Sequence, residues 1–585
     1  MLKPFAGKDI APYYPTVLDI ETSPDGEIIA IGFAYQNLEG ERIYAYYDSA
    51  ELWYREYCTT LLQFQGDKTL SKRLRKLYAH NGANFDYLGL YEYFHSQNLI
   101  LDGHYFMADS TGIGAAFTFK DNVDVIMVDS FRMLPASLDA LSKTFDVNHK
   151  KQELPKDCKN DYLKFKNKYP DLFREYLRND VLGLQEILFK FWSRIYSLFG
   201  NVGELPMTLP SLAIRIYSKS LDKPMMTPTD KKLKDLERVA YKGGLTLCMK
   251  TCEIEHINVY DVNSMYPAMM RDKRMPLSYK GYWTQTFNPN VIGIWRGTFI
   301  QHNHNLPPFM FDTKDGASYE GEGAYTTDEI NHLLLIGGTF QLEEGYVYTN
   351  TGYPFRGFIS RVYDMRKQAQ AASDEALAYT LKIMMNSLYG KFAQRETGMD
   401  IMVALASKQR ELVADKIPFQ LFGNFMAVPS ERYVPHVFVG LATHITAYAR
   451  VTLHTLMSNQ INAGYFVAYC DTDSVHTTGT MPTSNELGDV KLEYSGKAVY
   501  AGRKIYAIIT DDGKNKVKAK GIGRRTKQNL DYESIRKLVY DKALRIPYTF
   551  EVFPSVKEVL GERRKASVMI ERTRNLANTG GIWDE

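Results

Sequence analysis

Two aspartates that share one short turn, Asp471 and Asp473, have the residue type and spacing to hold a metal ion. Apolar, β-prone residues on both sides predict two strands that meet at this turn. Residues two apart on an extended chain point to the same side, so the carboxylates repel unless a proton or cation neutralises them. Such oxygen ligands suit Mg²⁺, which usually takes one or two carboxylates together with substrate phosphates. An ordinary acidic turn is the alternative, and acidic groups elsewhere in the chain favour the metal.

Three segments in the N-terminal third carry a second acidic set. Asp19 and Glu21 lie on one face of a predicted strand, and Asp86 lies in a polar loop that contains glycine. Tyr176 and Asp180 are four residues apart in a helical pattern, so they share one helix face. Taken singly, each is better explained by a surface acid or a helix cap. Together, four carboxylates can hold two Mg²⁺ ions about 3.5–4 Å apart for in-line phosphodiester hydrolysis, with the tyrosine orienting the attacking water.

Three later segments combine glycine, acidic and basic side chains. Paired glycines in the segment 241–244 allow a close approach to another chain or a phosphate, or simply a turn. Asp261 ends a predicted strand and precedes a turn and a helix start. Lys382, Asn386 and Tyr389 are spaced i, i+4, i+7, which places them on one helix face. That face is either the polar stripe of an amphipathic helix or a surface for a triphosphate and a base.

The composition limits the class of protein. A chain of 585 residues predicts three to five compact units. Lys+Arg 71 against Asp+Glu 68 is nearly balanced, which does not exclude nucleic acid because a local basic channel is sufficient. The 41 tyrosines suit stacking on bases. Five scattered cysteines predict reduced thiols, and we expect a cytoplasmic protein without a targeting signal or membrane segment.

The ordered set of segments resembles family B DNA polymerases over nearly the whole chain. The first three segments are similar to the Exo I, Exo II and Exo III motifs of the family's 3′-5′ exonuclease domain. The resemblance implies metal ligation by Asp19, Glu21, Asp86 and Asp180, and water orientation by Tyr176. It implies contacts to a frayed 3′ end from Thr22, Asn81, Phe85, Ser130 and Phe131. It also implies a catalytic lysine, either Lys151 or the adjacent Lys150.

The later segments resemble the family's polymerase motifs. The resemblance makes Asp261, Asp471 and Asp473 catalytic, with Asp261, Asp473 and the Val262 carbonyl as metal ligands. It implies nucleotide contacts from Tyr266, Arg366, Lys367, Lys382, Asn386, Tyr389 and Gly390, with Tyr266 excluding a 2′-hydroxyl. It implies primer and template contacts from Tyr241, Gly243, Gly244, Thr446, Arg450, Lys504 and Tyr506. The cluster Lys514, Lys516, Lys518, Lys520, Arg524, Arg525 and Lys527 fits a duplex-binding surface or a solvated face.

The resemblance implies a multidomain protein of α/β and α+β class, with an RNase H-like exonuclease domain and a right-hand polymerase domain. Two long segments that interrupt the polymerase motifs match, by position and length, the terminal protein regions of the compact protein-primed subgroup. The expected boundaries are 1–199 for the exonuclease, 200–272 and 432–532 for the palm, 273–355 and 394–431 for terminal protein regions 1 and 2, 356–393 for the fingers, and 533–585 for the thumb.

The resemblance implies template-directed DNA synthesis with 3′-5′ proofreading, through two-metal nucleotidyl transfer with Mg²⁺ (Mn²⁺ is possible) and two ions per site. The expected partners are primer/template DNA, dNTPs and a terminal protein that primes replication of a linear viral or plasmid genome, with strand displacement by a monomer. Two alternatives stay open. One is a family B polymerase that uses ordinary or self-made nucleic-acid primers, and the other is a non-catalytic DNA-binding replication factor.

Overall fold

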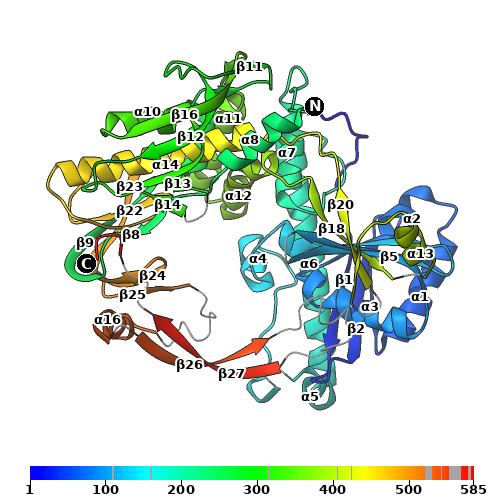
Figure 1. The fold of residues 1–585 in the computed structure, drawn as a ribbon. Coiled ribbons are helices and arrows are strands. Elements are labelled where there is room, and N and C mark those ends of the chain that lie inside the picture. The colour runs from blue at the N-terminus through cyan, green and yellow to red at the C-terminus, as the bar shows by residue number, and fades with distance from the viewer. Residues whose placement is uncertain are drawn as a thin grey trace.

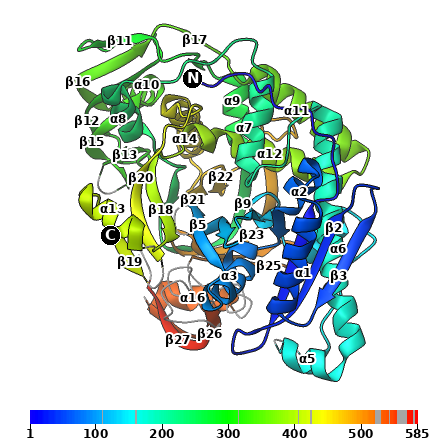
Figure 2. The same cartoon turned by 90° about the vertical axis from the view of Figure 1, so that its right-hand side faces the viewer.

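The structure, a computed structural model, describes residues 1–108, 111–158, 161–313, 316–404, 406–422, 425–520, 530–541, 543–552, 568–577 and 581–584. A ten-stranded sheet and a seven-stranded sheet organise the chain. The helices around the N-terminal sheet and those around the second sheet form separate lobes in Figure 1, and the C-terminal hairpin β26–β27 lies below them. Figure 2 shows the same lobes from the side of the N-terminal sheet.

In the first sheet, strand β1 (Thr16–Thr22) lies third from one edge, between β2 (Ile28–Gln36) and β4 (Lys76–Ala79). Its side chains alternate between two cores, because successive residues of a strand point to opposite faces. Val17 packs in the core that includes helix α6 (Pro170–Phe199), and Leu18 packs in the core that includes α1 (Ala50–Gln63). The remaining strands of the N-terminal region are β3 (Arg42–Tyr47), β5 (Ile100–Ala108), β6 (Thr111–Phe119) and β7 (Asp124–Asp129).

A glycine in β2 lets helix α6 lie close to the sheet. Gly32 pairs with Asp19 across the β1–β2 ladder. A Cβ at position 32 would lie 2.7 Å from Val181 Cγ2 and 3.0 Å from Leu177 Cγ, both on α6. Only glycine therefore allows this approach without a shift of the helix. As a result, the part of α6 that follows Leu177 lies over the strand that carries Asp19.

The second sheet has the order β25-β24-β23-β9-β22-β21-β8 and is antiparallel throughout. The long strand β9 (Cys252–Val262) lies at its centre, and the tight turn between β21 (Val467–Asp471) and β22 (Ser474–Thr477) lies beside the end of β9. Helix α14 (Val439–Asn462) packs against β21 and β22. The other strands are β8 (Thr246–Cys248), β23 (Val490–Gly502), β24 (Ile505–Thr510) and β25 (Asn515–Ala519).

Two long helices form the region predicted to be the fingers. Helix α11 (Arg356–Ala371) packs against α12 (Glu375–Phe392), and α12 packs against α7 (Leu209–Lys219). Asp374 is the N-cap of α12, and its side chain accepts a hydrogen bond from Leu377 N. Along the chain, the short helix α8 (Lys231–Ala240) precedes β9, and the short helix α9 (Met265–Asp272) follows it.

The first predicted insertion, 273–355, folds around a sheet of its own with the order β11-β16-β12-β15. Its helix α10 (Thr327–Leu335) begins with a capping box in which Thr326 and Glu329 exchange hydrogen bonds. Helix α10 packs on α14, and β15 packs on α8, so this segment rests on the second large sheet's helices. The strands are β11 (Gly281–Thr284), β12 (Gly293–Ile300), β15 (Glu320–Thr326) and β16 (Thr339–Tyr348).

The second predicted insertion, 394–431, joins the N-terminal sheet instead of forming a separate unit. Strand β18 (Thr397–Val403) pairs with β5, placing Ile401 opposite Tyr105 and Met402 opposite His104. Strands β20 (Phe425–Glu431) and β19 (Gln420–Phe422) follow β18 at the sheet edge, beside the N-terminal strands in Figure 1. Periodicity could not reveal this pairing, because the two strands are some three hundred residues apart along the chain.

The C-terminal region returns to the second large sheet twice. Helix α16 (Tyr532–Asp541) is held by Glu253 of β9, which pairs with Arg536 at 3.0 Å and accepts a hydrogen bond from Tyr532. Strands β26 (Ala543–Val552) and β27 (Val568–Ala577) then form an antiparallel hairpin. After the hairpin, the backbone N–H of Trp583 donates to Met249 O, next to β8.

A buried acid between α8 and α14 gives a pH-dependent stability. Glu237 accepts a 2.7 Å hydrogen bond from Tyr348, and burial raises the pKa of Glu237 from 4.5 to about 7. The folded state then binds more protons than the unfolded state between these values, so stability falls as pH rises through this window. We expect Glu237→Gln to gain up to about 3 kcal/mol relative to wild type between about pH 5 and pH 8. Melting temperatures at both pH values test this.

The exposed Glu343 provides the control for this measurement. Glu343→Gln should change the melting temperature equally at both pH values, because it replaces an exposed side chain of β16, the strand that carries Tyr348, and leaves the buried contact of Glu237 in place. An equal shift for Glu237→Gln at the two pH values would contradict the assignment of a raised pKa to Glu237.

Candidate active sites

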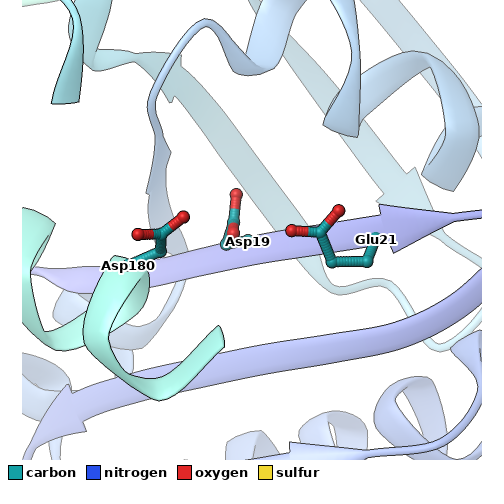
Figure 3. A group of neighbouring side chains, drawn as sticks. All are labelled: Asp19, Glu21 and Asp180. Carbon is teal, nitrogen blue, oxygen red and sulfur yellow. The ribbon is translucent and has the colours of Figure 1, made fainter. Parts of the chain in front are cut away.

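Three carboxylates converge where β1 meets α6. Ligand oxygens of Asp19, Glu21 and Asp180 all lie within 4.8 Å of one another. Figure 3 shows Asp19 and Glu21 on the strand and Asp180 on the helix, with the three carboxyl groups turned toward a common point. Burial, together with the charges of neighbouring acidic groups, raises the pKa of both Asp19 and Glu21 well above the ordinary range. A set of buried acids that repel each other in this way is suited to a cation.

The fourth predicted ligand, Asp86, lies beside this cluster. Its Oδ1 accepts a 2.9 Å hydrogen bond from Ile20 N, the residue between Asp19 and Glu21. Burial raises the pKa of Asp86 to about 7 despite that hydrogen bond. The charge of Asp86 also raises the pKa of Asp19, so the four predicted acids form one electrostatic unit.

The structure distinguishes the two candidate lysines. Lys151 Nζ donates to Asp180 Oδ2 at 2.5 Å and to Tyr176 Oη at 3.1 Å. Lys150 points elsewhere and lies 3.3 Å from Asp146, with its side chain largely exposed. Lys151 is therefore the lysine that belongs to the acidic cluster.

Two residues near this cluster were missed by the sequence analysis. Tyr162, on the short helix before α6, lies with its ring 6.2 Å from that of Tyr176, and the acidic cluster contributes to the raised pKa of its hydroxyl. Asp129, at the end of β7, is fully buried, and burial raises its pKa to about 6. Asp129 accepts from Phe131 N at 2.9 Å and faces Asp86 electrostatically. Asp129 precedes the predicted contact residue Ser130, and that position was its one signal in the sequence.

The predicted contacts to a 3′ end have different surroundings. Phe85 is 37% exposed, and the backbone of Asn81 is left-handed with φ 63°, at the start of the loop before Asp86. Thr22 and Phe131 are partly exposed. Ser130 is buried, and its hydroxyl donates to Ala79 O and contacts His80. A direct contact from the Ser130 hydroxyl to DNA is therefore a prediction that this conformation does not support.

The second acidic cluster lies at the end of β9. Asp261 pairs with Lys491 of β23 on one side and with Ser474 of β22 on the other. The β21–β22 turn places Thr472 in the left-handed region, at φ 64°, between Asp471 and Asp473. Val262 N donates to Asp473 O at 2.8 Å, which holds this turn against the end of β9.

Electrostatics connect this cluster to helix α12. Burial and the charge of Asp473 raise the pKa of Asp261 to about 7. Burial and the charge of Asp471 raise the pKa of Asp473. The positive charge of Lys382 opposes this rise in the pKa of both Asp261 and Asp473, so the exposed lysine of α12 lies within electrostatic range of the two carboxylates. The structure thus brings together three segments that are far apart in the sequence.

Asp471 has different partners. Its Oδ1 accepts from Thr246 Oγ1 at 2.9 Å and from Lys504 Nζ at 3.0 Å. The backbone N–H of Lys504 donates to the Tyr469 hydroxyl, and the Tyr506 ring lies 4.9 Å from the Tyr469 ring. Asp471 is therefore tied to the β23–β24 turn, whereas the charge of Asp473 acts on Asp261.

A layer of tyrosines lies over the turn. The rings of Tyr266 and Tyr389 are 4.5 Å apart, and the hydroxyl of Tyr241 influences Tyr389 electrostatically. A Cβ at Gly244 would lie 2.8 Å from Thr472 Oγ1 and 3.0 Å from the Tyr266 hydroxyl. The second glycine of the pair is thus required by close packing against the acidic turn.

The other predicted nucleotide contacts lie on α11 and α12. Arg366 approaches the Ser264 hydroxyl at 3.5 Å, and its Nε is buried without a hydrogen-bond partner. Lys367 instead pairs with Glu486 at 2.7 Å. Asn386 is partly exposed, and a Cβ at Gly390 would meet open space, so the protein itself does not require that glycine.

Two predicted DNA contacts are corrected by the structure. Arg450 is buried, and its guanidinium pairs with Glu329 and donates to two backbone carbonyl groups. Thr446 is also buried, and its hydroxyl donates to Thr443 O one turn earlier in α14. Neither side chain can reach DNA from the interior, because both already have their hydrogen-bond partners within the fold. Any effect of these two residues on DNA binding must act through other groups.

A row of lysines follows strand β25. Lys516 and Lys518 are exposed on one face of the strand, and the exposed Lys520 follows directly after its last residue. Lys518 pairs with Tyr506, and Lys520 N donates to Lys504 O, so the row ends beside Asp471. Arg524, Arg525 and Lys527 of the same predicted cluster lie outside the described residues.

Both acidic clusters have the donor chemistry of a hard divalent cation. Asp180 Oδ1 is buried without a hydrogen-bond partner, in addition to the repulsion within its cluster. Asp261 and Asp473 repel each other at the end of β9. Carboxylate oxygens in such numbers fit Mg²⁺ or Mn²⁺ better than a metal that prefers nitrogen or sulfur.

Two stretches of the chain match the model of a known protein family. A sequence profile described as DNA polymerase type B, organellar and viral, matches residues 67–172 and 162–417, which is more than half of the chain. The chain belongs to this family of type B DNA polymerases. This confirms the resemblance to family B, including its phage-type branch.

Individual relatives agree with this result. A protein named probable DNA polymerase from Neurospora intermedia is 26% identical over 80% of this chain and 55% of its own length. The DNA-directed DNA polymerase of Enterobacteria phage PRD1 is 26% identical over 80% of this chain and 81% of its own. The chain spans about half the length of the first curated relatives it matches.

A solved structure shows the fold. Phi29 DNA polymerase, solved with primer-template DNA and incoming nucleotides, superimposes with a TM-score of 0.73, 19% identity and coverage of 97% of this chain and 100% of the other. The predicted fold class, a multidomain protein of α/β and α+β class with the fold of such a polymerase, is confirmed. Among the described helices, none is long and apolar enough to cross a membrane.

Proposed function

We propose that this chain is a DNA-directed DNA polymerase with a separate 3′-5′ exonuclease site. One observation carries the proposal: two clusters of mutually repelling carboxylates lie on two different sheets, and each has a lysine beside it. A single cluster would fit many metal enzymes. Two clusters in this family fit one site that adds nucleotides and another that removes them.

At the exonuclease site, Asp19, Glu21, Asp86 and Asp180 would hold Mg²⁺ or Mn²⁺. Lys151 donates to Tyr176, and burial raises the pKa of Tyr176, so the hydroxyl stays protonated and orients the attacking water through hydrogen bonds. Lys151 also carries positive charge toward the phosphate that is cleaved. Phe85 and Asn81 line the approach and contact the frayed 3′ end.

At the polymerase site, Asp261, Asp473 and the Val262 carbonyl would hold the ions, and Asp471 keeps Lys504 in place. Bound ions, two per site, would activate the attacking hydroxyl and offset charge on the phosphates. Lys382, Arg366 and the other predicted contacts on α11 and α12 bind the triphosphate. Tyr266 packs beneath the incoming sugar and leaves no room for a 2′-hydroxyl.

DNA binds along the tyrosine and lysine surfaces beside this site. Tyr241, Gly243 and Gly244 contact the template strand, and Lys504 and Tyr506 steady the primer end. Lys516, Lys518 and Lys520 extend this surface with exposed positive charge, which suits phosphate contacts.

The two predicted insertions support initiation on a terminal protein and unaided strand displacement. The segment 273–355 forms a sheet of its own, as a docking unit requires. The segment 394–431 links the fingers to the exonuclease sheet, where it helps to surround DNA. The alternative within this function is synthesis from ordinary nucleic-acid primers.

Extension of one primer on a circular single strand, with Mg²⁺, dNTPs and no helper protein, tests the proposal. We expect products many circles long, because a polymerase that displaces strands continues past its own starting point. Products of one circle would retain the polymerase and remove strand displacement, and with it the proposed roles of both insertions. An absence of any extension would favour a non-catalytic DNA-binding factor.

A further inference from the structure

The first insertion reaches the segment that carries Tyr241 and the paired glycines through a buried ion pair. Glu329, in the first turn of α10, lies against Arg450 of α14, and both side chains are almost fully buried. Glu329 Oε1 accepts from Arg450 Nη2 at 2.6 Å and from Nε at 3.2 Å. A buried charge pair of this kind holds its partners firmly, because loss of one member leaves the other buried without a partner.

Each oxygen of Glu329 has a different task. Oε2 accepts from Thr326 N at 2.9 Å and from the Thr326 hydroxyl at 3.1 Å, which completes the helix cap. Oε1 is left for the arginine. The cap alone would account for one carboxylate oxygen, since glutamine serves equally well at this position of a capping box. The negative charge is therefore explained by Arg450 and not by the helix start.

Arg450 transmits this contact to the backbone of the glycine segment. Its Nη1 donates to Lys242 O at 2.9 Å and to Gly243 O at 2.8 Å. The next residue, Gly244, packs against Thr472, and Leu245 O accepts from Thr472 N at 2.7 Å. Thr472 lies between Asp471 and Asp473. A continuous path of hydrogen bonds and packing contacts thus runs from the insertion to the acidic turn 471–473.

A second buried contact from the same insertion holds the segment from its other end. Tyr348 of β16 donates to Glu237 of α8 at 2.7 Å. Helix α8 ends at Ala240, immediately before Tyr241. Residues of the insertion therefore hold Tyr241–Gly244 from both sides, Tyr348 through Glu237 of α8 and Glu329 through Arg450.

We propose that Glu329 is a positioning residue of the polymerase site, which acts through Arg450 to hold the Tyr241–Gly244 segment where template DNA and the catalytic turn need it. The inference rests on the proposed polymerase function. It gives the first insertion a role in DNA-primed synthesis itself, apart from any docking of a priming protein. It also gives Arg450, a predicted DNA contact that is buried, an indirect role through the carbonyl groups of Lys242 and Gly243.

The test uses Glu329→Gln in the full chain. Glutamine can keep the helix cap through its amide oxygen, but it carries no charge and therefore cannot form the ion pair with Arg450. We expect primer/template DNA to bind about tenfold more weakly, the size of one lost charged hydrogen bond. Single-strand degradation should be unchanged, because the exonuclease site lies on the other sheet. A general loss of stability would lower both activities together, so the split between them separates positioning from folding.

Two further variants complete the test. Glu344→Gln removes an ion pair between the same insertion and Lys232 at the start of α8, far from the glycine segment, and should leave primer/template binding unchanged. The double variant Glu329→Gln with Arg450→Met removes both buried charges, and because methionine has no hydrogen-bond donor it leaves the carbonyls of Lys242 and Gly243 without this partner. We expect it to recover thermal stability and to bind DNA as weakly as the single variant.

Three results would overturn the inference while the proposed function stands. In each of them the wild type extends primers. The first is that Glu329→Gln binds primer/template DNA as tightly as the wild type, and the second is that the double variant recovers DNA affinity together with stability. The third is that Glu344→Gln weakens DNA binding as much as Glu329→Gln does. Failure of the wild-type chain to extend any primer would instead remove the proposed function on which the inference rests.

Discussion

Asp473→Asn is expected to abolish DNA synthesis and to leave 3′-5′ degradation of single strands intact. The charge of Asp473 acts on Asp261 at the end of β9, and in the proposed function the two would share the cation that synthesis requires. Loss of one such ligand removes several kcal/mol of transition-state stabilisation, so extension should fall by roughly a thousandfold or more. Because burial and Asp471 raise the pKa of Asp473, removal of its charge should not destabilise the fold. Primer extension, single-strand degradation and thermal melting measure the three quantities.

Glu255→Gln is the matched control for this experiment. Glu255 lies on the same strand β9, its side chain is 83% exposed, and its partner Lys497 is on the surface. It should synthesise and degrade DNA like wild type. If Asp473→Asn loses both activities while it stays folded, the model of two separate sites is wrong.

Asp19→Ala should give the reverse result, with degradation lost and synthesis retained. Asp19 is on β1 and belongs to the acidic cluster that β1 and α6 form, the proposed exonuclease site. Burial and the charges of Asp86 and Asp180 raise the pKa of Asp19. Loss of this ligand should lower degradation of a single strand by roughly a thousandfold. Synthesis on a matched primer should continue, since Asp261 and Asp473 lie on another sheet. A mismatched 3′ end should no longer be trimmed before extension.

An exposed acid six residues further along the chain, Asp25, serves as the control for this second variant. Asp25→Asn should leave both activities at the wild-type rate, because its side chain lies in the turn after β1. Retention of degradation in Asp19→Ala would show that the β1–α6 cluster is not the exonuclease site. Loss of synthesis in a folded Asp19→Ala would show that the two clusters are not independent.

The placement of the second insertion bears on how these sites cooperate. Strand β18 extends the exonuclease sheet at β5, and Lys408 pairs with Asp102 at 2.7 Å across the same junction. The segment begins directly after α12, which carries Lys382. Helix α12 is therefore connected to the N-terminal sheet through the paired strands β18 and β5, and this limits how far the two can move apart.

The sequence by itself determined the local arrangement of the functional groups. Alternation on a strand places Asp19 and Glu21 on one face, and helical spacing places Tyr176 and Asp180 on another. The order of the segments identified the family and the fold class. These features depend on neighbours within a few residues, where backbone geometry is fixed by the strand or helix, so the sequence is sufficient to predict them.

Only the tertiary structure decided which distant groups meet. In the structure, Lys151 contacts the acidic cluster and Lys150 does not. Arg450, predicted to contact DNA, is buried and pairs with Glu329, which is more than a hundred residues away in the sequence. The structure also places β18 against β5. Contacts of this kind depend on packing between elements, as at Gly32 where the missing side chain lets α6 approach β1. No periodicity in one sequence carries that information, because the partners are set by the shape of the whole core.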